Sequence, residues 1–311
     1  MSNVPLPLEG IRVLAPEQVI AGPYGSMILA SFGADVIRVE RPPTGDMYRT
    51  NLPYIENERG RTGYGLLAHN LNKRSIVLDL QREEARQIFR DLAKKVDVLW
   101  ENNRPGVMDR LGLGYQDIRA INPRIVYVSV SGFGQTWASD SPYADWPAFD
   151  IVAQAMAGLM MRAGSEGAPP IYSGYPLGDL FPSVIATLGC LIALRGRDLT
   201  GQGQHVDISM YDAMTSLLTT VFSAYTFDKS LATRGGMGTS FPYGSFACRD
   251  GYFVLAVAGD VMWQRLCKLL DRPDLFADES LKTGTGRAAR APFLRGIVED
   301  WAREKTRLEV V

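Results

Sequence analysis

Apolar and polar residues alternate along the first 130 or so positions in the pattern of strands that are each followed by a helix. Apolar runs that predict buried strands occupy residues 11–16, 34–41, 75–80, 96–102 and 124–134. Helical patterns occupy residues 22–33, the stretch after residue 80, and residues 116–121. The second of these helices has a 3.6-residue apolar spacing that places on one face Ala85, Ile88, Phe89, Leu92 and Val96. This alternation predicts an α/β fold with a Rossmann-like, doubly wound parallel sheet.

The carboxyl ends of the predicted strands are where such a sheet binds its ligands. These ends read "QVIAGP", "RVERPPTGD" and "WENNRPG". The segment after the first strand, "EQVIAGPYGS", lacks the G-x-G-x-x-G spacing, and the chain contains no G-x-x-x-x-G-K-[ST] loop. A classical NAD-binding domain and a nucleotide-hydrolysing P-loop are therefore both disfavoured.

The pattern changes near residue 225. The segment 234–260 is rich in glycine and holds two short β-like runs around "RDG", followed by a helical pattern at 261–270. We therefore predict a large domain over residues 1–225 and a smaller α+β domain over residues 226–311. A last amphipathic helix is predicted from the spacing of Leu294, Ile297, Val298, Trp301 and Leu308. Because no stop signal follows, we expect the chain to be cut short within this helix at its last residue.

Composition restricts the partners and the chemistry. The formal net charge of -1 over 311 residues predicts no general attraction to nucleic acid or to an anionic membrane. Cys190, Cys248 and Cys267 form no C-x-x-C pair and no signal peptide precedes them, so we expect a cytoplasmic protein. With only His69 and His205, a histidine-rich metal site is excluded and no metal is expected.

Asp179 lies in "LGDLFPS", directly before a long apolar run. The run stops at Arg195, which is short for a membrane span, so no transmembrane segment is predicted. Aspartate is a leading N-cap residue, and from the residues alone a cap is the commoner role. If Leu180 were the first helical residue, however, Pro182 would be the third and would offer no N–H to the cap. The residues alone leave the choice between a cap and a chemical role open.

Several motifs occur together in a characteristic order. They are "LEGIRVL", "AGPYGSMILASFGADVIRVERP", "NLNKRSIVLDL", "ENNRPGVMDRLGLGY", "NPRIVYVSVSGFGQ", "GDL" and "LTGQGQHVDISMYDAM". From about residue 8 to its end the chain resembles the family III CoA-transferases, the group of formyl-CoA transferase and the carnitine CoA-transferases. The resemblance implies an interlocked homodimer in which a C-terminal segment returns to the first domain. This chain lacks that segment, and we expect it to be truncated before it.

The resemblance implies that Asp179 is the nucleophile. Its carboxylate would attack an acyl-CoA thioester to give a mixed aspartyl anhydride and free CoA thiolate. We expect the helix N-terminus to hold this carboxylate ionised at neutral pH and to weaken it as a nucleophile. The glycine loop with Gly235, Gly236 and Gly238 resembles a loop that covers the active aspartate in some members, and a plain connection between domains is the alternative.

CoA carries several phosphates, and the resemblance assigns residues to it. They are Ile20, Ala21, Arg38, Asn70, Lys73, Asn102, Arg110, Phe149 and Asp150. For each of the cations, a solvated surface position is the alternative. Asn103 departs from the family, because many relatives have an aromatic residue there and any stacking from it is lost.

Two other functions stay open at this point. In the related α-methylacyl-CoA racemases a His-Asp pair moves the proton, whereas here Phe149 precedes Asp150 and cannot exchange one. A CoA-binding protein without catalysis is the other alternative. We expect acyl-CoA and a small carboxylic acid as substrates, with no tightly bound cofactor. Candidate residues for the acid pocket, with core packing as the alternative for the first two, are Met160, Met161, Tyr172, Tyr175 and Met237.

Overall fold

The computed structural model describes residues 4–58, 60–135, 141–144, 146–164, 167–231, 234–235 and 240–311. The chain divides into two compact units. The first comprises Met1–Leu159 and Tyr172–Leu218, and the second comprises Met160–Ile171 and Thr219–Val311. The sequence-based boundary lay between residues 225 and 226.

The first unit is built on a six-stranded sheet in which every neighbouring pair of strands is parallel. The order is β5-β2-β1-β6-β7-β8, with strands at Arg74–Val77, Asp35–Glu40, Arg12–Ala15, Val98–Glu101, Val126–Ser131 and His205–Ser209. The predicted α/β fold with a parallel sheet is thus confirmed. The order in which the chain adds strands reverses between β1 and β6. Ligands of such sheets bind at this switch point.

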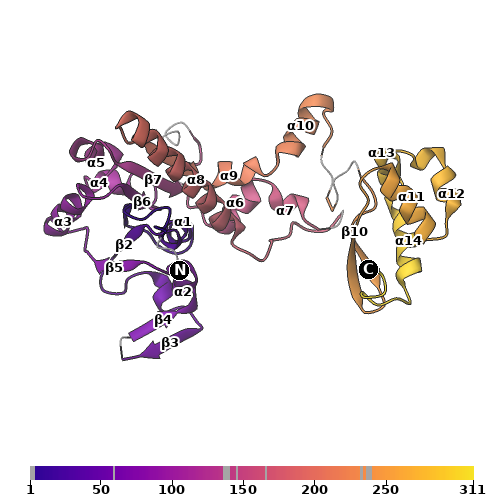
Figure 1. Ribbon diagram of the computed structural model, residues 1–311, viewed down its shortest axis with the longest axis horizontal. Helices are drawn as coiled ribbons and strands as arrows, with labels where there is room; N and C mark the ends of the chain where they lie inside the picture. Colours follow the sequence, from indigo (N-terminus) through magenta and orange to yellow (C-terminus); the bar gives the residue numbers. More distant parts are fainter. Residues whose placement is uncertain are drawn as a thin grey trace. The chain divides into compact units, whose positions relative to one another are not determined.

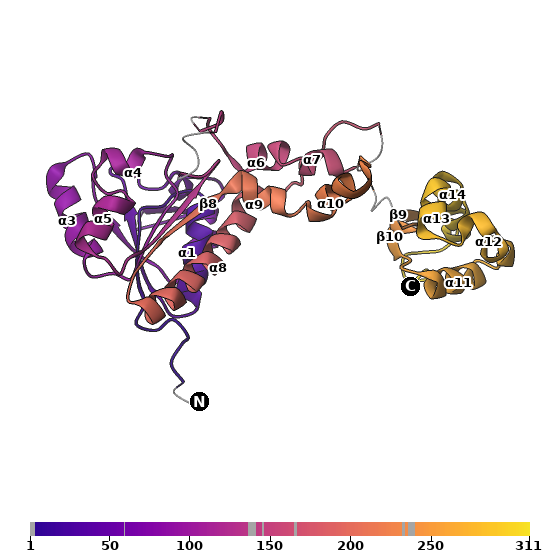
Figure 2. The same ribbon diagram turned by 90° about the horizontal axis from the view of Figure 1, so that it is seen from above.

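Helices cover both faces of this sheet (Figures 1 and 2). On one face lie α1 (Ala21–Ser31), α6 (Asp150–Met156), α8 (Leu177–Thr200) and α9 (Met210–Ser216). On the other lie α3 (Glu83–Ala93), α4 (Val107–Arg110) and α5 (Tyr115–Ile121). In α3, Ala85 and Phe89 are buried as predicted, but Ile88 is 51% exposed and its predicted place on the buried face is wrong. It lies at the edge of the stripe, where a small rotation brings it into solvent.

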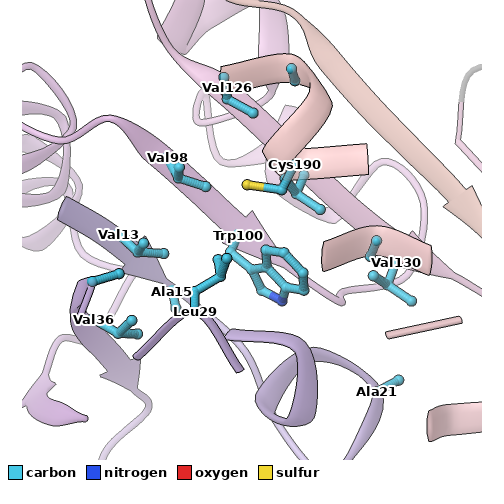
Figure 3. Packing of buried hydrophobic residues seen from close by; sticks show 14 of the residues in the cluster. Val13, Ala15, Ala21, Leu29, Val36, Val98, Trp100, Val126, Val130 and Cys190 are labelled. Atoms are coloured by element: carbon cyan, nitrogen blue, oxygen red, sulfur yellow. The ribbon is translucent and has the colours of Figure 1, made fainter. Parts of the chain in front are cut away.

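The core between the sheet, α1 and α8 is centred on the fully buried Trp100 (Figure 3). Its indole Nε1 donates to the carbonyl oxygen of Gly22, 2.9 Å away. A Cβ on Gly25 would lie 2.3 Å from the Trp100 ring and 3.0 Å from the carbonyl oxygen of Ser183. Glycine in "AGPYG" therefore lets α1 pack closely against both Trp100 and α8.

Helix α8 is longer than the sequence suggested. Its 24 residues run past Arg195 to Thr200 and end at Gly201, whose φ of +75° suits glycine. Within the described residues it is the one helix that has the length and apolar composition of a membrane span. Ala186, Cys190 and Ala193 on it are fully buried in the core of the first unit, which is the arrangement of a core helix.

Smaller elements complete the first unit. They are a 3-10 turn at Met47–Arg49, the hairpin of β3 (Tyr54–Asn57) and β4 (Gly60–Gly63), and α2 (Tyr64–His69). The sequence analysis predicted neither this hairpin nor β8.

The second unit has an antiparallel hairpin and short helices. The hairpin, β9 (Tyr243–Cys248) with β10 (Gly251–Ala256), confirms the two β-like runs predicted around "RDG". The helices are α7 (Leu159–Arg162), which begins at the boundary, α10 (Thr219–Asp228), α11 (Asp260–Leu269), α12 (Pro273–Ala277), α13 (Gly284–Ala289) and α14 (Ala291–Ala302), with a 3-10 turn at Glu279–Leu281. Helix α14 ends at Ala302, and Leu308 is 91% exposed. The prediction that the helix continues to the last residue is wrong, because Leu308 has no apolar surface to cover.

Candidate active site

At the switch point of the sheet, side-chain amides form hydrogen bonds between neighbouring loops. The backbone N–H of Gln18, after β1, donates to Asn102 Oδ1 at 2.9 Å. Asn102 Nδ2 donates back to the Gln18 carbonyl oxygen at 2.9 Å, and Asn103 Nδ2 donates to the Pro16 carbonyl oxygen at 3.2 Å. The two asparagines of "ENNRPG" therefore hold the loop after β1 against the loop after β6.

A cavity of about 210 Å³ lies at this edge of the sheet. Its lining residues come from the carboxyl ends of β1, β2 and β6 with the segments after them, from the segment after β5, and from α4: Pro16, Glu17, Gln18, Val39, Glu40, Arg41, Gly45, Asp46, Leu78, Asp79, Leu80, Gln81, Asn103, Val107, Met108 and Leu111. The structure thus has a cavity where the sheet topology predicts a ligand.

Arg38, on β2, lies in a buried group of charges and is 2% exposed. Its Nη2 donates to Asp46 Oδ2 at 2.7 Å, and its guanidinium also lies 3.7 Å from Glu17 Oε1 and 3.8 Å from Glu40 Oε1. Burial acts to raise the pKa of Glu40, but hydrogen bonds from Arg49 and Ser75 hold it at about 2. A buried cation needs such partners, since an unpaired charge in this position would be strongly destabilising.

Lys73 is buried against the same group. Its Nζ lies 2.7 Å from Glu17 Oε1, 2.7 Å from the Pro23 carbonyl oxygen and 2.9 Å from Asn70 Oδ1. Burial lowers the pKa of Lys73 to about 8, although the Glu17 carboxylate opposes this. Three acceptors therefore fix the ammonium group.

The three cations predicted to bind CoA therefore lie in two different environments in this structure. Arg38 and Lys73 are buried in ion pairs, so a solvated surface position, the alternative for each, is wrong for both. Arg110 lies exposed at the end of α4. Contact of any of them with CoA stays a prediction. The sequence analysis missed Glu17 and Asp46, although both lie in the strand-end segments that it singled out.

Asp179 is the third residue of α8, which begins at Leu177 with Pro176 at its N-cap. An N-cap role for Asp179 is therefore wrong, and Pro182 lies inside the helix rather than at its third position. Helix α8 begins earlier than the apolar run suggests, because Pro176 at the N-cap already starts the helix at Leu177. Ser183 Oγ lies 2.6 Å from the carbonyl oxygens of both Asp179 and Ala21, which joins the first turn of α8 to the start of α1.

Burial, together with the smaller effect of the neighbouring Asp150 carboxylate, raises the pKa of Asp179 to about 7. The prediction that the helix N-terminus holds this group fully ionised at neutral pH is wrong. Removal of water from the carboxylate outweighs the partial positive charge of the helix end. The anion of Asp179 is therefore more basic than that of an exposed aspartate, and part of the group is protonated near neutral pH.

Asp150, the first residue of α6, lies beside this nucleophile candidate. Its Oδ1 accepts from the backbone N–H of Gly178 at 2.6 Å, and its Oδ2 accepts from the Tyr172 hydroxyl at 3.0 Å. The side-chain amide of Gln154 donates to both oxygens at 2.9 and 3.0 Å. The structure therefore brings Asp150 and Asp179 together at the N-terminal end of α8, with donors fixing the first carboxylate.

Other predicted residues lie around this pair or outside it. Ile20 and Ala21, at the start of α1, are 7% and 6% exposed, and Phe149, at the N-cap of α6, is 65% exposed. Tyr48, which the sequence analysis did not name, is close enough to matter electrostatically: burial raises the pKa of its phenol, and the Asp179 charge adds to the shift.

The candidate loop and acid pocket are only partly described. Gly235 donates from its backbone to the Arg162 carbonyl oxygen at 3.4 Å within the second unit. Gly236, Gly238 and Met237 lie outside the described residues. Among the remaining pocket candidates, Tyr172 and Tyr175 belong to the first unit and Met160 and Met161 to the second.

Known proteins resemble this chain over nearly its whole length. The profile of CoA-transferase family III matches residues 8–311. Over 298 residues the chain is 40% identical to succinyl-CoA:mesaconate CoA-transferase of Haloarcula hispanica, covering 94% of this chain and 74% of the relative. It is 36% identical to acetyl-CoA:oxalate CoA-transferase of Acetobacter aceti, with coverage of 94% and 74%.

Solved structures give the same result. A CaiB/BaiF family protein from Brucella suis superposes with a TM-score of 0.84 at 32% identity, covering 99% of this chain and 81% of that one. The Rv3272 protein of M. tuberculosis superposes with a TM-score of 0.85 at 30% identity, with the same coverage. The parallel sheet and these neighbours define an α/β protein of the CaiB/BaiF type. The chain belongs to CoA-transferase family III, and its relatives support CoA transfer as its activity.

Proposed function

We propose that this protein transfers CoA from succinyl-CoA to a small dicarboxylic acid, with Asp179 as the nucleophile. The observation that carries the proposal is the partly buried Asp179 carboxylate, with a pKa of about 7, beside Asp150 at the start of α8. Perturbed carboxylate pairs of this kind concentrate at functional sites. The substrate class follows from relatives named for transfer from succinyl-CoA to mesaconate and to L-malate.

In the first step, an oxygen of the Asp179 carboxylate attacks the thioester carbonyl carbon of the donor. The C–S bond breaks, CoA leaves as the thiolate, and the acyl group remains on Asp179 as a mixed anhydride. The thiolate then attacks the aspartyl carbonyl carbon of that anhydride. This releases the donor acid as its carboxylate and leaves CoA on Asp179 as a thioester.

The acceptor acid reverses these steps. Its carboxylate attacks the aspartyl thioester, which releases the thiolate and forms a second mixed anhydride. Attack of the thiolate on the acceptor's acyl carbon gives the new acyl-CoA and regenerates the Asp179 carboxylate. No net proton, electron or water is consumed, so positioning and partial desolvation carry the rate.

We further propose that CoA binds at the edge of the sheet formed by the carboxyl ends of its strands, as a substrate and not as a resident cofactor. The residues proposed to contact it are those assigned by resemblance: Ile20, Ala21, Arg38, Asn70, Lys73, Asn102, Arg110, Phe149 and Asp150. Racemase chemistry is disfavoured because Phe149 carries no exchangeable proton. We also propose that the protein is a cytoplasmic homodimer. The glycine loop, with Gly235, Gly236 and Gly238, is proposed to cover Asp179.

The Asp179→Asn variant tests the proposal. It keeps the shape of the side chain but removes the nucleophilic charge, so transfer from succinyl-CoA to mesaconate or malate should fall by at least about a thousandfold. Mass spectrometry of the wild-type protein mixed with succinyl-CoA should find an adduct on the peptide that contains Asp179, and none in the variant.

Asp198→Asn, on the exposed end of α8, is the matched control and should keep wild-type turnover, because its side chain is 57% exposed. Turnover by Asp179→Asn within tenfold of the wild type would exclude Asp179 as the nucleophile. Binding of CoA without transfer and without an adduct in the wild type would instead favour a non-catalytic binding protein.

A further inference from the structure

The turn between β1 and α1 contains a strained residue. Val19 has a φ of +66°, in the left-handed region that β-branched side chains rarely adopt. A residue persists in this conformation only where its surroundings hold it, and such residues concentrate at functional sites. Val19 stands one residue before Ile20, the N-cap of α1.

Asp46 is the side chain that holds this turn. Its Oδ2 accepts from the backbone N–H of Val19 at 3.0 Å and from Arg38 Nη2 at 2.7 Å. Its Oδ1 accepts from the backbone N–H of Tyr48 at 2.8 Å. The residue is 5% exposed, and its own N–H donates to Glu40 Oε2 at 3.1 Å. Asp46 therefore joins two segments that meet the site from different parts of the chain.

Both segments lead to Asp179. Along the first, Val19 is followed after one residue by Ala21, whose carbonyl oxygen lies 2.6 Å from Ser183 Oγ; the same Oγ lies 2.6 Å from the Asp179 carbonyl oxygen. Along the second, Tyr48 is near enough for the Asp179 charge to act on its phenol.

The Tyr48 ring is itself confined. A Cβ on Gly65 would lie 2.7 Å from that ring, and the His69 ring centroid lies 6.5 Å from its own. The ring thus depends on the backbone position that Asp46 sets.

We propose that Asp46 is a positioning residue for CoA transfer, which fixes the strained Val19 turn and the Tyr48 segment relative to Asp179. This role rests on the function proposed above. Asp46 acts through other groups and is not proposed to touch the Asp179 carboxylate or the thioester carbon. Its carboxylate accepts hydrogen bonds from three donors, and no neutral side chain of its size has acceptors for all three.

Two variants test the positioning role: Asp46→Asn alone, and Asp46→Asn combined with Val19→Gly. Asparagine keeps the size but offers a single acceptor oxygen, so we expect kcat for transfer from succinyl-CoA to fall at least tenfold in protein that is folded by circular dichroism. Glycine adopts a positive φ without strain, so the Asp46→Asn/Val19→Gly double variant should regain at least threefold in kcat. Relief of a destabilised fold alone would not restore kcat per folded molecule.

Asp271, in the second unit, has a φ of +54° and gives a matched control. The Asp46→Asn/Asp271→Gly variant removes positive-φ strain elsewhere and should regain no kcat. Equal recovery from both glycine variants, or no recovery from Val19→Gly, overturns the positioning role. So does an Asp46→Asn variant whose kcat is within twofold of the wild type.

Ser183→Ala tests the same connection without disturbing the buried charges, so it decides the question if Asp46→Asn does not fold. It should lower kcat at least threefold, and an unchanged kcat overturns the connection from Val19 to Asp179. If the wild-type protein itself transfers no CoA, the proposed function fails and this role falls with it. Wild-type activity with unaffected variants would refute the positioning role alone.

Discussion

The chemistry of the site depends on how burial changes one carboxylate. Asp179 lies in the first turn of α8, where the helix end favours its anion, yet burial raises its pKa to about 7. The raised pKa makes the anion a stronger nucleophile than that of an exposed aspartate, but it also leaves part of the group protonated near neutral pH. The identity of the residue was predictable from "GDL" before an apolar run. Its environment was not, because the neighbouring Asp150 carboxylate stands on another helix, α6.

This environment predicts the pH dependence of the reaction. Only ionised Asp179 attacks the thioester, so kcat/KM for succinyl-CoA should fall about tenfold per pH unit below a midpoint near pH 7 and level off above it. Asp150→Asn removes a neighbouring negative charge, which lowers the pKa of Asp179 and moves the midpoint to lower pH. The midpoint should stay above 4, because burial is the larger cause and remains.

The Asp198→Asn variant serves again as the control and should keep the wild-type midpoint, since its carboxylate is exposed at the other end of α8. The measurement is the initial rate at low succinyl-CoA concentration across pH 5 to 9. A wild-type midpoint near 4 would show that Asp179 is an ordinary carboxylate in the free enzyme.

At the scale of elements, apolar patterns predicted the strands of the sheet that carry an apolar run, and they missed the strands that carry none. Strands β1, β6 and β7 are continuous apolar runs in the interior of the sheet, and each was predicted within a few residues. Strand β8 (His205–Ser209) is half-buried at the sheet edge and polar, so it carries no such run. The β3–β4 hairpin is mostly exposed and was missed for the same reason.

The packing of α1 against the sheet gives a test at this scale. Gly25→Ala places a Cβ 2.3 Å from the fully buried Trp100 ring, which cannot move aside. We expect the free energy of unfolding to fall by about 1–3 kcal/mol, as for other overpacked cores. Activity should fall as well, since α1 and α8 carry the two sides of the site.

Gly196→Ala, in the interior of α8, is the matched control. Its nearest neighbour to a new Cβ is Gln204 Nε2 at 4.0 Å, so the substitution meets open space. Alanine should stabilise the helix by about 0.5–1 kcal/mol relative to glycine. Urea unfolding of both variants measures the difference, and equal stabilities would contradict the packing seen around Trp100.

At the scale of the molecule, the sequence predicted the family and the layers but not the buried charges. Arg38, Lys73 and Glu17 were visible as charged residues, but their pairing joins positions as far as 56 residues apart in the chain. Hydrophobic periodicity contains no information about which charges meet. The family resemblance came instead from local motifs, each of which keeps its spacing whatever it contacts. The family profile matches residues 8–311 and confirms it.

The exposed face of α8 leads to a prediction about assembly. Val184, Leu188, Ile192 and Leu199 lie at helical spacing and are 43%, 54%, 61% and 70% exposed, so they form an apolar stripe on a helix whose other face is in the core. A stripe of this kind is typical of a surface that another chain covers. We expect the protein to be a homodimer that uses this stripe.

The Leu188→Asp/Ile192→Asp variant should therefore sediment as a monomer while keeping the circular dichroism spectrum of the wild type, because two charges cannot be buried in an apolar interface without large cost. Ile88→Asp is the control: Ile88 is 51% exposed on α3, on the opposite face of the sheet, and this variant should remain dimeric. Sedimentation velocity at several concentrations distinguishes the two. A wild-type monomer, or a variant at positions 188 and 192 that stays dimeric, would show that the stripe has another role.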